Sequence, residues 1–106
     1  MQLPQVIADY FAAANTDDAD RVAACFADDA VVRDEGRDHC GRGAVRVWAR
    51  ETRRKYRYHA EIRTAEKVAD RTIVTAHLTG DFPGSPVDLR YRFTLAGGKI
   101  VALEIG

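Results

Sequence analysis

Apolar residues in the first half of the chain recur every three or four positions, which is the spacing of an amphipathic helix. The pattern predicts helices over residues 4–15, 19–27 and 44–55. Pro4 suits the first turn of the first helix, and Asp18 can cap the second. A short strand that starts at Ala30 is predicted to lead into a polar loop over 36–43. We therefore expect this half to be mainly helical.

In the second half of the chain, apolar and polar residues alternate instead, as they do in half-buried strands. The pattern predicts strands over residues 57–68, 72–82, 87–95 and 100–105. In the clearest of them, Val87, Leu89, Tyr91 and Phe93 share one face. Helices followed by strands indicate an α+β fold, in which three N-terminal helices pack on a curved antiparallel sheet.

Length and composition are those of an ordinary globular protein. The chain has 106 residues, of which 46% are hydrophobic and 30% charged, so we expect a single domain over 1–106. No run approaches the roughly 20 apolar residues of a membrane helix, and the N-terminus lacks the basic and apolar regions of a signal peptide. These features predict a cytoplasmic protein without a membrane partner.

The balance of 16 basic and 16 acidic residues conceals an uneven distribution along the chain. Acidic residues dominate positions 1–35, whereas basic residues dominate positions 46–63. We expect the two regions to neutralise each other at the surface; the alternative is a basic patch for an anionic partner. The net charge of zero argues against a nucleic-acid partner.

Cysteine and histidine residues do not form a recognisable metal motif. Cys25 and Cys40 are separated by 14 residues and match no zinc-site spacing, while His39 and Cys40 are expected to form an exposed loop pair. Cys25 is expected to be a buried free thiol. We therefore predict neither a metal nor a cofactor.

Two stretches carry a resemblance to a known family. These motifs are Phe26-Ala27-Asp28-Asp29-Ala30-Val31-Val32-Arg33-Asp34 and Gly41-Arg42-Gly43-Ala44. Together with the order of elements, they resemble the nuclear transport factor 2-like superfamily. Within it, the chain is similar to SnoaL-like polyketide cyclases and ketosteroid isomerases. The resemblance implies a cone-shaped α+β barrel that encloses a pocket for an apolar small molecule. It also implies a homodimer formed through the outer face of the sheet.

The resemblance also implies roles for individual residues. Asp34 matches the general base that removes a proton next to a carbonyl, and Tyr10 matches approximately the hydrogen-bond donor to the enolate oxygen. Tyr91 could supply a second donor, because the alternation of its strand turns it inward. We expect the substrate pocket to be walled by Phe26, Val32, Trp48 and Phe93.

The chain departs from the isomerases at one point that matters for activity. Their second, protonated acid would fall at Arg90 or Tyr91, so the arrangement of two acids is missing. An epoxide hydrolase would need an arginine between two pocket carboxylates, and Asp34 is the one inward acid that the pattern identifies. Two functions stay open: isomerase or cyclase chemistry based on Asp34, and a non-catalytic module that binds a ligand or dimerises.

Overall fold

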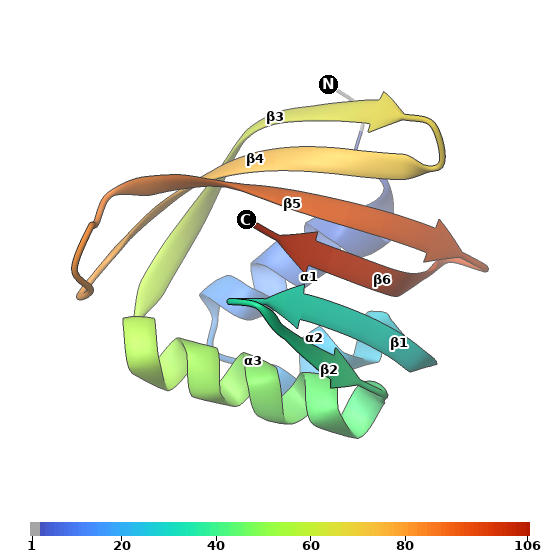
Figure 1. Cartoon of the computed structure of the whole chain (residues 1–106), viewed down its shortest axis with the longest axis horizontal. Helices are drawn as coiled ribbons and strands as arrows, with labels where there is room; N and C mark the ends of the chain where they lie inside the picture. Colours follow the sequence, from blue (N-terminus) through green and yellow to red (C-terminus); the bar gives the residue numbers. More distant parts are fainter. Residues whose placement is uncertain (1–2) are drawn as a thin grey trace.

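Six strands form one curved sheet in the computed structural model, and helices cover one of its faces (Figure 1). The structure describes residues 3–106. Its elements are α1 (Gln5–Asn15), α2 (Ala19–Ala24), β1 (Phe26–Asp34), β2 (Arg37–Cys40), α3 (Arg42–Tyr56), β3 (Tyr58–Val68), β4 (Arg71–Gly80), β5 (Val87–Ala96) and β6 (Lys99–Ile105). This is the α+β class predicted from the sequence.

The strands lie in the order β2-β1-β6-β5-β4-β3. Strands β3 to β6 form the antiparallel meander that the alternation predicts, whereas β1 pairs with β6 in parallel. The sheet does not close into a barrel, because β2 and β3 are edges without a strand between them. Helix α3 links these two edges: it begins after β2, ends before β3 and packs on α2, β1 and β2. At about 1.5 Å per residue its 15 residues span roughly 22 Å.

Two of the predicted boundaries around β1 are wrong. Helix α2 ends at Ala24 rather than at residue 27, and β1 begins at Phe26 rather than at Ala30. The reason is non-local: Phe26 pairs with Ile100 of β6, and the Ile100 N–H donates to the Cys25 carbonyl at 2.9 Å. Pairing with a strand at the far end of the chain therefore overrides the local helical spacing.

The predicted polar loop over 36–43 also contains a strand. Asp34 pairs with Arg37 across a two-residue turn, which makes β1 and β2 a hairpin. Both turn residues, Glu35 (φ 53°) and Gly36 (φ 74°), have the positive φ that such tight hairpin turns require. This hairpin carries Asp34 to the end of β1, next to α3.

The core lies between the helices and the inner face of the sheet. Tyr10 and Phe11 of α1 contact Phe26, Tyr91 and Phe93, with ring centroids 5.0 to 6.3 Å apart. Most of these pairs are edge-to-face, a favourable geometry for aromatic rings. The alternating apolar faces predicted for β3, β4 and β5 are the buried faces in the structure.

Two ion pairs join the basic region over 46–63 to the acidic region over 1–35, as predicted, and Arg42, just before the basic region, forms a third. Arg42 forms an ion pair with Asp28 at 2.8 Å, Arg46 with Asp20 at 3.3 Å and Lys55 with Glu35 at 3.5 Å. All three bases lie on α3 and all three acids lie in the first 35 residues. These contacts are largely exposed, so we expect each to contribute little to stability.

Asn15, the last residue of α1, takes the place of a strand partner for the edge strand β3. Its Nδ2 donates to the Ala60 carbonyl at 2.9 Å, and its Oδ1 accepts from the Ala60 N–H at 2.8 Å. Both bonds are partly buried, so removing the amide leaves two backbone groups without partners.

We expect Asn15→Ala to lower the free energy of unfolding by about 2 kcal/mol. Gln5→Ala is the matched control, because Gln5 also forms a side-chain hydrogen bond on α1 but in an exposed position, and it should cost less than about 0.5 kcal/mol. Urea denaturation followed by circular dichroism measures both. Equal stabilities of the two variants would contradict the role assigned to Asn15.

Candidate active site

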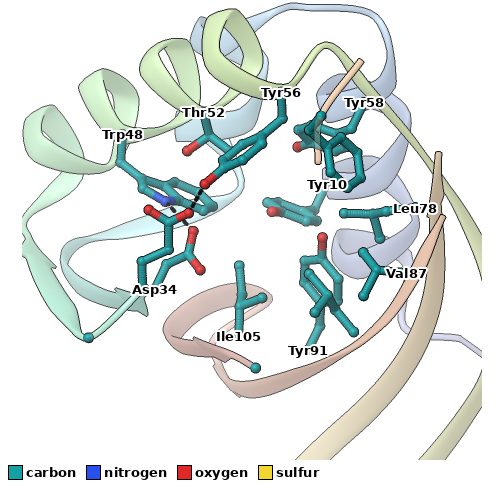
Figure 2. Close-up of a pocket in the computed structure, with 15 residues that line it drawn as sticks. Tyr10, Asp34, Trp48, Thr52, Tyr56, Tyr58, Leu78, Val87, Tyr91 and Ile105 are labelled. Carbon is teal, nitrogen blue, oxygen red and sulfur yellow. Dashed lines mark hydrogen bonds between the residues drawn. The ribbon is translucent and has the colours of Figure 1, made fainter. Parts of the chain in front are cut away.

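A pocket of about 380 Å³ opens between α3 and the inner face of the sheet (Figure 2). Leu78, Val87, Leu89 and Ile105 form an apolar wall from β4, β5 and β6. Polar groups of four different elements also line the pocket: Tyr10 of α1, Asp34 of β1, Trp48 of α3 and Tyr58 of β3. The volume falls in the range of roughly 300–1,000 Å³ that is typical of small-molecule sites.

Asp34 is the partly buried carboxylate on the pocket wall. The Trp48 indole N–H donates to its Oδ2 at 3.0 Å, as Figure 2 shows. Burial raises the pKa of Asp34, the neighbouring Glu35 charge adds to the increase, and the hydrogen bond from Trp48 opposes it. A carboxylate with a raised pKa in an apolar pocket is a stronger base than one in water.

Three tyrosines turn their hydroxyl groups toward the same space. Tyr10, Tyr58 and Tyr91 are 1%, 8% and 2% exposed, and no side-chain hydrogen bond among residues 3–106 involves these three hydroxyls. Burial raises the pKa of Tyr58 to about 12 and raises the pKa values of Tyr10 and Tyr91 well above their ordinary range. All three are therefore neutral donors at physiological pH, available to an oxygen atom of a ligand.

The rim of the pocket is formed by side chains from three segments. Tyr56, the last residue of α3, donates a hydrogen bond to Glu35 in the β1–β2 turn. Its ring packs edge-to-face on Phe82, in the loop between β4 and β5, with centroids 5.6 Å apart. The hydrogen bond from Tyr56 lowers the pKa of Glu35, so this carboxylate stays charged at the mouth while Asp34 lies deeper.

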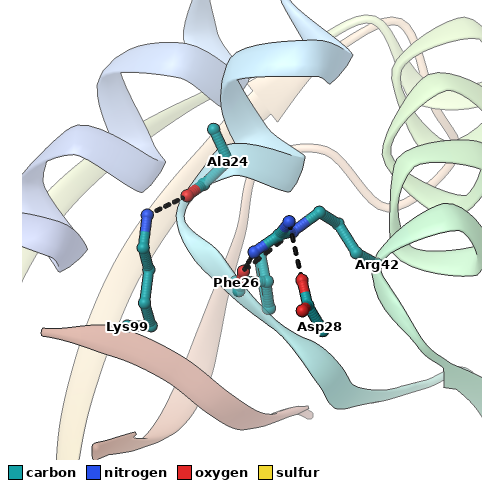
Figure 3. A network of polar contacts seen from close by, with 5 residues as sticks. All are labelled: Ala24, Phe26, Asp28, Arg42 and Lys99. Atoms are coloured by element: carbon teal, nitrogen blue, oxygen red, sulfur yellow. Dashed lines mark hydrogen bonds and ion pairs between the residues drawn. The ribbon is translucent and has the colours of Figure 1, made fainter. Parts of the chain in front are cut away.

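Helix α3 is held against β1 by a polar network at its first turn (Figure 3). The Arg42 guanidinium donates to the Phe26 carbonyl through Nε at 3.1 Å and Nη2 at 2.8 Å, and it pairs with Asp28. Nearby, Lys99 Nζ donates to the Ala24 carbonyl at 2.7 Å, where α2 ends. The contacts of Arg42 fix α3 relative to β1, which sets the position of Trp48 against Asp34, while Lys99 joins β6 to α2.

The structure brings four of the predicted site residues together at the pocket: Asp34, Tyr10, Tyr91 and Trp48. Tyr91 points inward, as its alternation predicts, and Arg90 is exposed. The three other predicted wall residues are placed differently. Phe26, Val32 and Phe93 are fully buried and do not line the pocket, and Tyr10 of α1 packs edge-to-face on both Phe26 and Phe93.

Several lining residues were not predicted from the sequence. The sequence did contain an indication that Tyr58 faces inward, because it is the first inward-facing residue of a strand whose alternation was recognised. Glu35 also lines the pocket, although Asp34 was the one inward acid that the pattern identified. Tyr56 and Thr52 depend on how the end of α3 approaches the sheet, and no local pattern indicates that approach.

Other groups that could carry chemistry do not line this pocket. Both cysteines are free, with Cys25 buried and Cys40 exposed on β2, and His39 lies beside Trp48 with ring centroids 6.2 Å apart. Within residues 3–106 no three metal-binding side chains come together. Over the same residues, no helix combines the length and the apolar character needed to cross a membrane.

Solved structures support the fold and differ in how closely their sequences match. A candidate polyketide cyclase from Sinorhizobium meliloti is 40% identical over 98% of this chain and 95% of its own, with a TM-score of 0.93. A protein from Catenulispora acidiphila with a ketosteroid isomerase-like fold is 20% identical over 99% of this chain and 86% of its own, with a TM-score of 0.86. A nuclear transport factor 2-like protein from Cytophaga hutchinsonii is 8% identical over 100% of this chain and 90% of its own, with a TM-score of 0.80.

The last two structures are similar in fold alone, and the resemblance predicted from the sequence is confirmed. No curated protein matches the chain. The SnoaL-like domain family matches residues 7–103, which is nearly the full length. The chain therefore belongs to the SnoaL-like domain family.

Proposed function

We propose that the pocket binds a small apolar carbonyl compound and that Asp34 removes a proton from the carbon next to its carbonyl group. The observation that carries this proposal is the position of Asp34, a carboxylate with a raised pKa on the wall of a largely apolar pocket. Three neutral phenol donors face the same pocket. Together they supply a base and an oxyanion site, the two requirements of enolate chemistry.

The step balances within the pocket. The C–H bond breaks, its proton passes to Asp34, and its electron pair moves to form the enolate, whose oxygen accepts a hydrogen bond from a tyrosine. In an unsaturated ketone the enolate is conjugated with the double bond, so return of the proton from Asp34 to the far carbon shifts that double bond. In a dicarbonyl compound, attack of the enolate carbon on the second carbonyl closes a ring, and the alkoxide formed takes the proton back from Asp34. The apolar wall of Leu78, Val87 and Leu89 holds the rest of the molecule and excludes water.

The test is exchange of α-protons into deuterated water, followed by nuclear magnetic resonance on a panel of cyclic, linear and aryl ketones. The proposal predicts that the protein accelerates exchange for ketones that fit the pocket. A ketone that binds, as seen by quenching of the single tryptophan Trp48, but shows no accelerated exchange would point to the non-catalytic binding module. Absence of accelerated exchange across the whole panel contradicts proton abstraction.

Trp48 allows a separate prediction about pH. In Trp48→Phe an aromatic ring remains but the N–H that favours the ionised form of Asp34 is lost, so the pKa of Asp34 should rise further. Because proton abstraction needs the carboxylate, the acid limb of the exchange-rate profile should move to higher pH. The measurement is the exchange rate against pH for both proteins, and superimposable profiles would exclude this role of the indole.

We also propose that the chain forms a homodimer through the face of the sheet that the helices leave uncovered. This outer face carries Ile73, Thr75 and His77 of β4 with Arg90, Arg92 and Thr94 of β5. Basic and acidic side chains lie next to each other on neighbouring strands of this face. Arg92 of β5 is paired with Ile73 of β4 on one side and with Glu104 of β6 on the other, and His77 contacts Asp88 at 2.6 Å. A surface with both signs can pair with its own copy about a two-fold axis.

Light scattering should therefore give about twice the chain mass of 11.8 kDa. Ile73→Lys is expected to shift the particle toward the monomer by adding an unpaired charge to the interface. Val47→Lys is the matched control, because Val47 is 53% exposed on α3, away from this face. A wild-type particle of the monomer mass would refute the dimer.

A further inference from the structure

Tyr58 differs from the two other pocket tyrosines in what lies against its ring. The Arg53 guanidinium sits over the Tyr58 ring, 5.2 Å from the ring centroid. The rings of Tyr10 and Tyr91 instead pack on each other and on aromatic neighbours such as Phe93. Among residues 3–106, no cation lies over the Tyr10 or Tyr91 ring.

Arg53 is fixed in this position and its charge is not neutralised. It donates hydrogen bonds to the Tyr58 carbonyl and, at 3.4 Å, to the Asn15 carbonyl. It takes part in none of the ion pairs formed within the described part of the chain. Because Arg53 is half-buried, its charge is screened less than that of a surface arginine.

A positive charge beside a phenol stabilises the phenolate and so makes the hydroxyl a more acidic donor. Burial raises the pKa of Tyr58 to about 12, and Arg53 opposes that increase. For Tyr10 and Tyr91, burial and the neighbouring acidic groups all act to raise the pKa. Of the three hydroxyls, that of Tyr58 is therefore best suited to stabilise negative charge on an oxygen.

We propose that Tyr58 donates the hydrogen bond to the enolate oxygen and that Arg53 is a positioning residue that holds Tyr58 in place with its positive charge over the ring. This inference rests on the function proposed above. It moves the principal donor from α1 or β5, where the resemblance implied it, to the first residue of β3.

The test uses para-nitrophenolate as a stable mimic of the enolate oxygen, bound to the Asp34→Asn protein. The amide introduced by this substitution is neutral, so it does not repel the anion, and its oxygen can still accept the Trp48 N–H. Binding is followed by quenching of Trp48 fluorescence. para-Nitrotoluene has a similar shape without the oxygen and reports packing in the pocket alone.

In that background, adding Tyr58→Phe should weaken phenolate binding about tenfold and leave nitrotoluene binding unchanged. Tyr10→Phe and Tyr91→Phe each remove one hydroxyl from the same pocket and test the two alternative donors. They should weaken phenolate binding by less than about threefold. Because the Tyr58 hydroxyl has no protein partner within residues 3–106, its removal leaves no unpaired group, and Tyr58→Phe is expected to fold.

The role of Arg53 is tested by variants that remove or keep its positive charge. Arg53→Met should weaken phenolate binding and raise the pKa of Tyr58, measured as the difference between the ultraviolet titrations of proteins with and without Tyr58→Phe. Arg53→Lys should restore most of the affinity, because the charge remains even though the paired hydrogen bonds are altered. A merely structural arginine would leave the titration of Tyr58 unmoved and would not be rescued by lysine.

The failure of this inference and that of the proposed function look different. If Tyr10→Phe or Tyr91→Phe loses phenolate affinity and Tyr58→Phe does not, the assignment of Tyr58 is overturned while the oxyanion site stands. If phenolate binds no more tightly than nitrotoluene before any tyrosine is changed, the pocket has no oxyanion site. In that case the inference and the proposed function fail together.

Discussion

We expect Asp34→Asn to lower the rate of α-proton exchange by about a hundredfold to ten-thousandfold, which is the usual contribution of a positioned general base. The amide keeps the size of the side chain and can accept the Trp48 N–H, so the pocket should keep its shape. Affinity for a ketone, measured by Trp48 fluorescence, should therefore change little while exchange is lost. A variant that exchanges protons at the wild-type rate would exclude Asp34 as the base.

The free energy of unfolding distinguishes a variant that has lost only the catalytic base from one that has lost its fold. Since burial raises the pKa of Asp34, the native state binds this proton more tightly than the unfolded chain does. The stability contributed by Asp34 therefore falls as pH rises from the ordinary aspartate value through the raised native value. At neutral pH, Asp34→Asn should be more stable than the wild type, by less than about 1 kcal/mol because Asp34 is only partly buried. Asp29→Asn, at an exposed position of the same strand, is the matched control and should affect neither exchange nor stability.

Gly80→Ala should be among the most destabilising single changes in the chain, at about 3 kcal/mol or more. A Cβ at Gly80 would lie 2.7 Å from the Arg57 carbonyl oxygen, 2.9 Å from the Tyr56 carbonyl oxygen and 2.9 Å from the Tyr58 Cα. These are backbone atoms that cannot rotate away, so the end of α3 must separate from β4. Tyr56 and Tyr58 line the pocket, and ligand affinity should fall together with stability.

Gly43→Ala is the control for this prediction. Gly43 lies in the first turns of α3 with no heavy atom within 4 Å of an added Cβ, and alanine favours the helix. We expect it to raise the free energy of unfolding by about 0.5–1 kcal/mol. Guanidinium denaturation followed by circular dichroism measures both variants, and a Gly80→Ala protein as stable as Gly43→Ala would contradict the close approach.

Alternation was enough to predict β3 to β6, because each of these strands has one buried face and pairs with its neighbour in sequence. Tyr91 and Phe93 show this: both lie on the predicted inner face and are buried. The same local reasoning failed around Phe26, which fits a helical stripe yet begins β1. Its partner is Ile100, and pairing between distant segments leaves no trace in the spacing near Phe26.

Site residues could be predicted from the sequence where they matched a motif of the family. Contacts that depend on how two elements pack together could be predicted much less well. Asp34 and Tyr10 were found by resemblance, and both line the pocket. The contact between Trp48 and Asp34 was not predicted, because it depends on how α3 lies against the β1–β2 hairpin. Arg53 over Tyr58 is a contact of the same kind: it requires the backbone to reverse direction at Arg57, where φ is 46°.

The central position of β6 has a consequence for how the protein forms on the ribosome. β6 lies between β1 and β5, and it is the last of the six strands to be synthesised. Until Lys99–Ile105 emerges, β1 has only the four-residue β2 as a partner, and the β3–β5 meander cannot join it. The nascent chain can form its helices and local hairpins early, but the two parts of the sheet unite only when this strand inserts. Folding of the domain therefore cannot be completed before β6 has left the ribosomal tunnel.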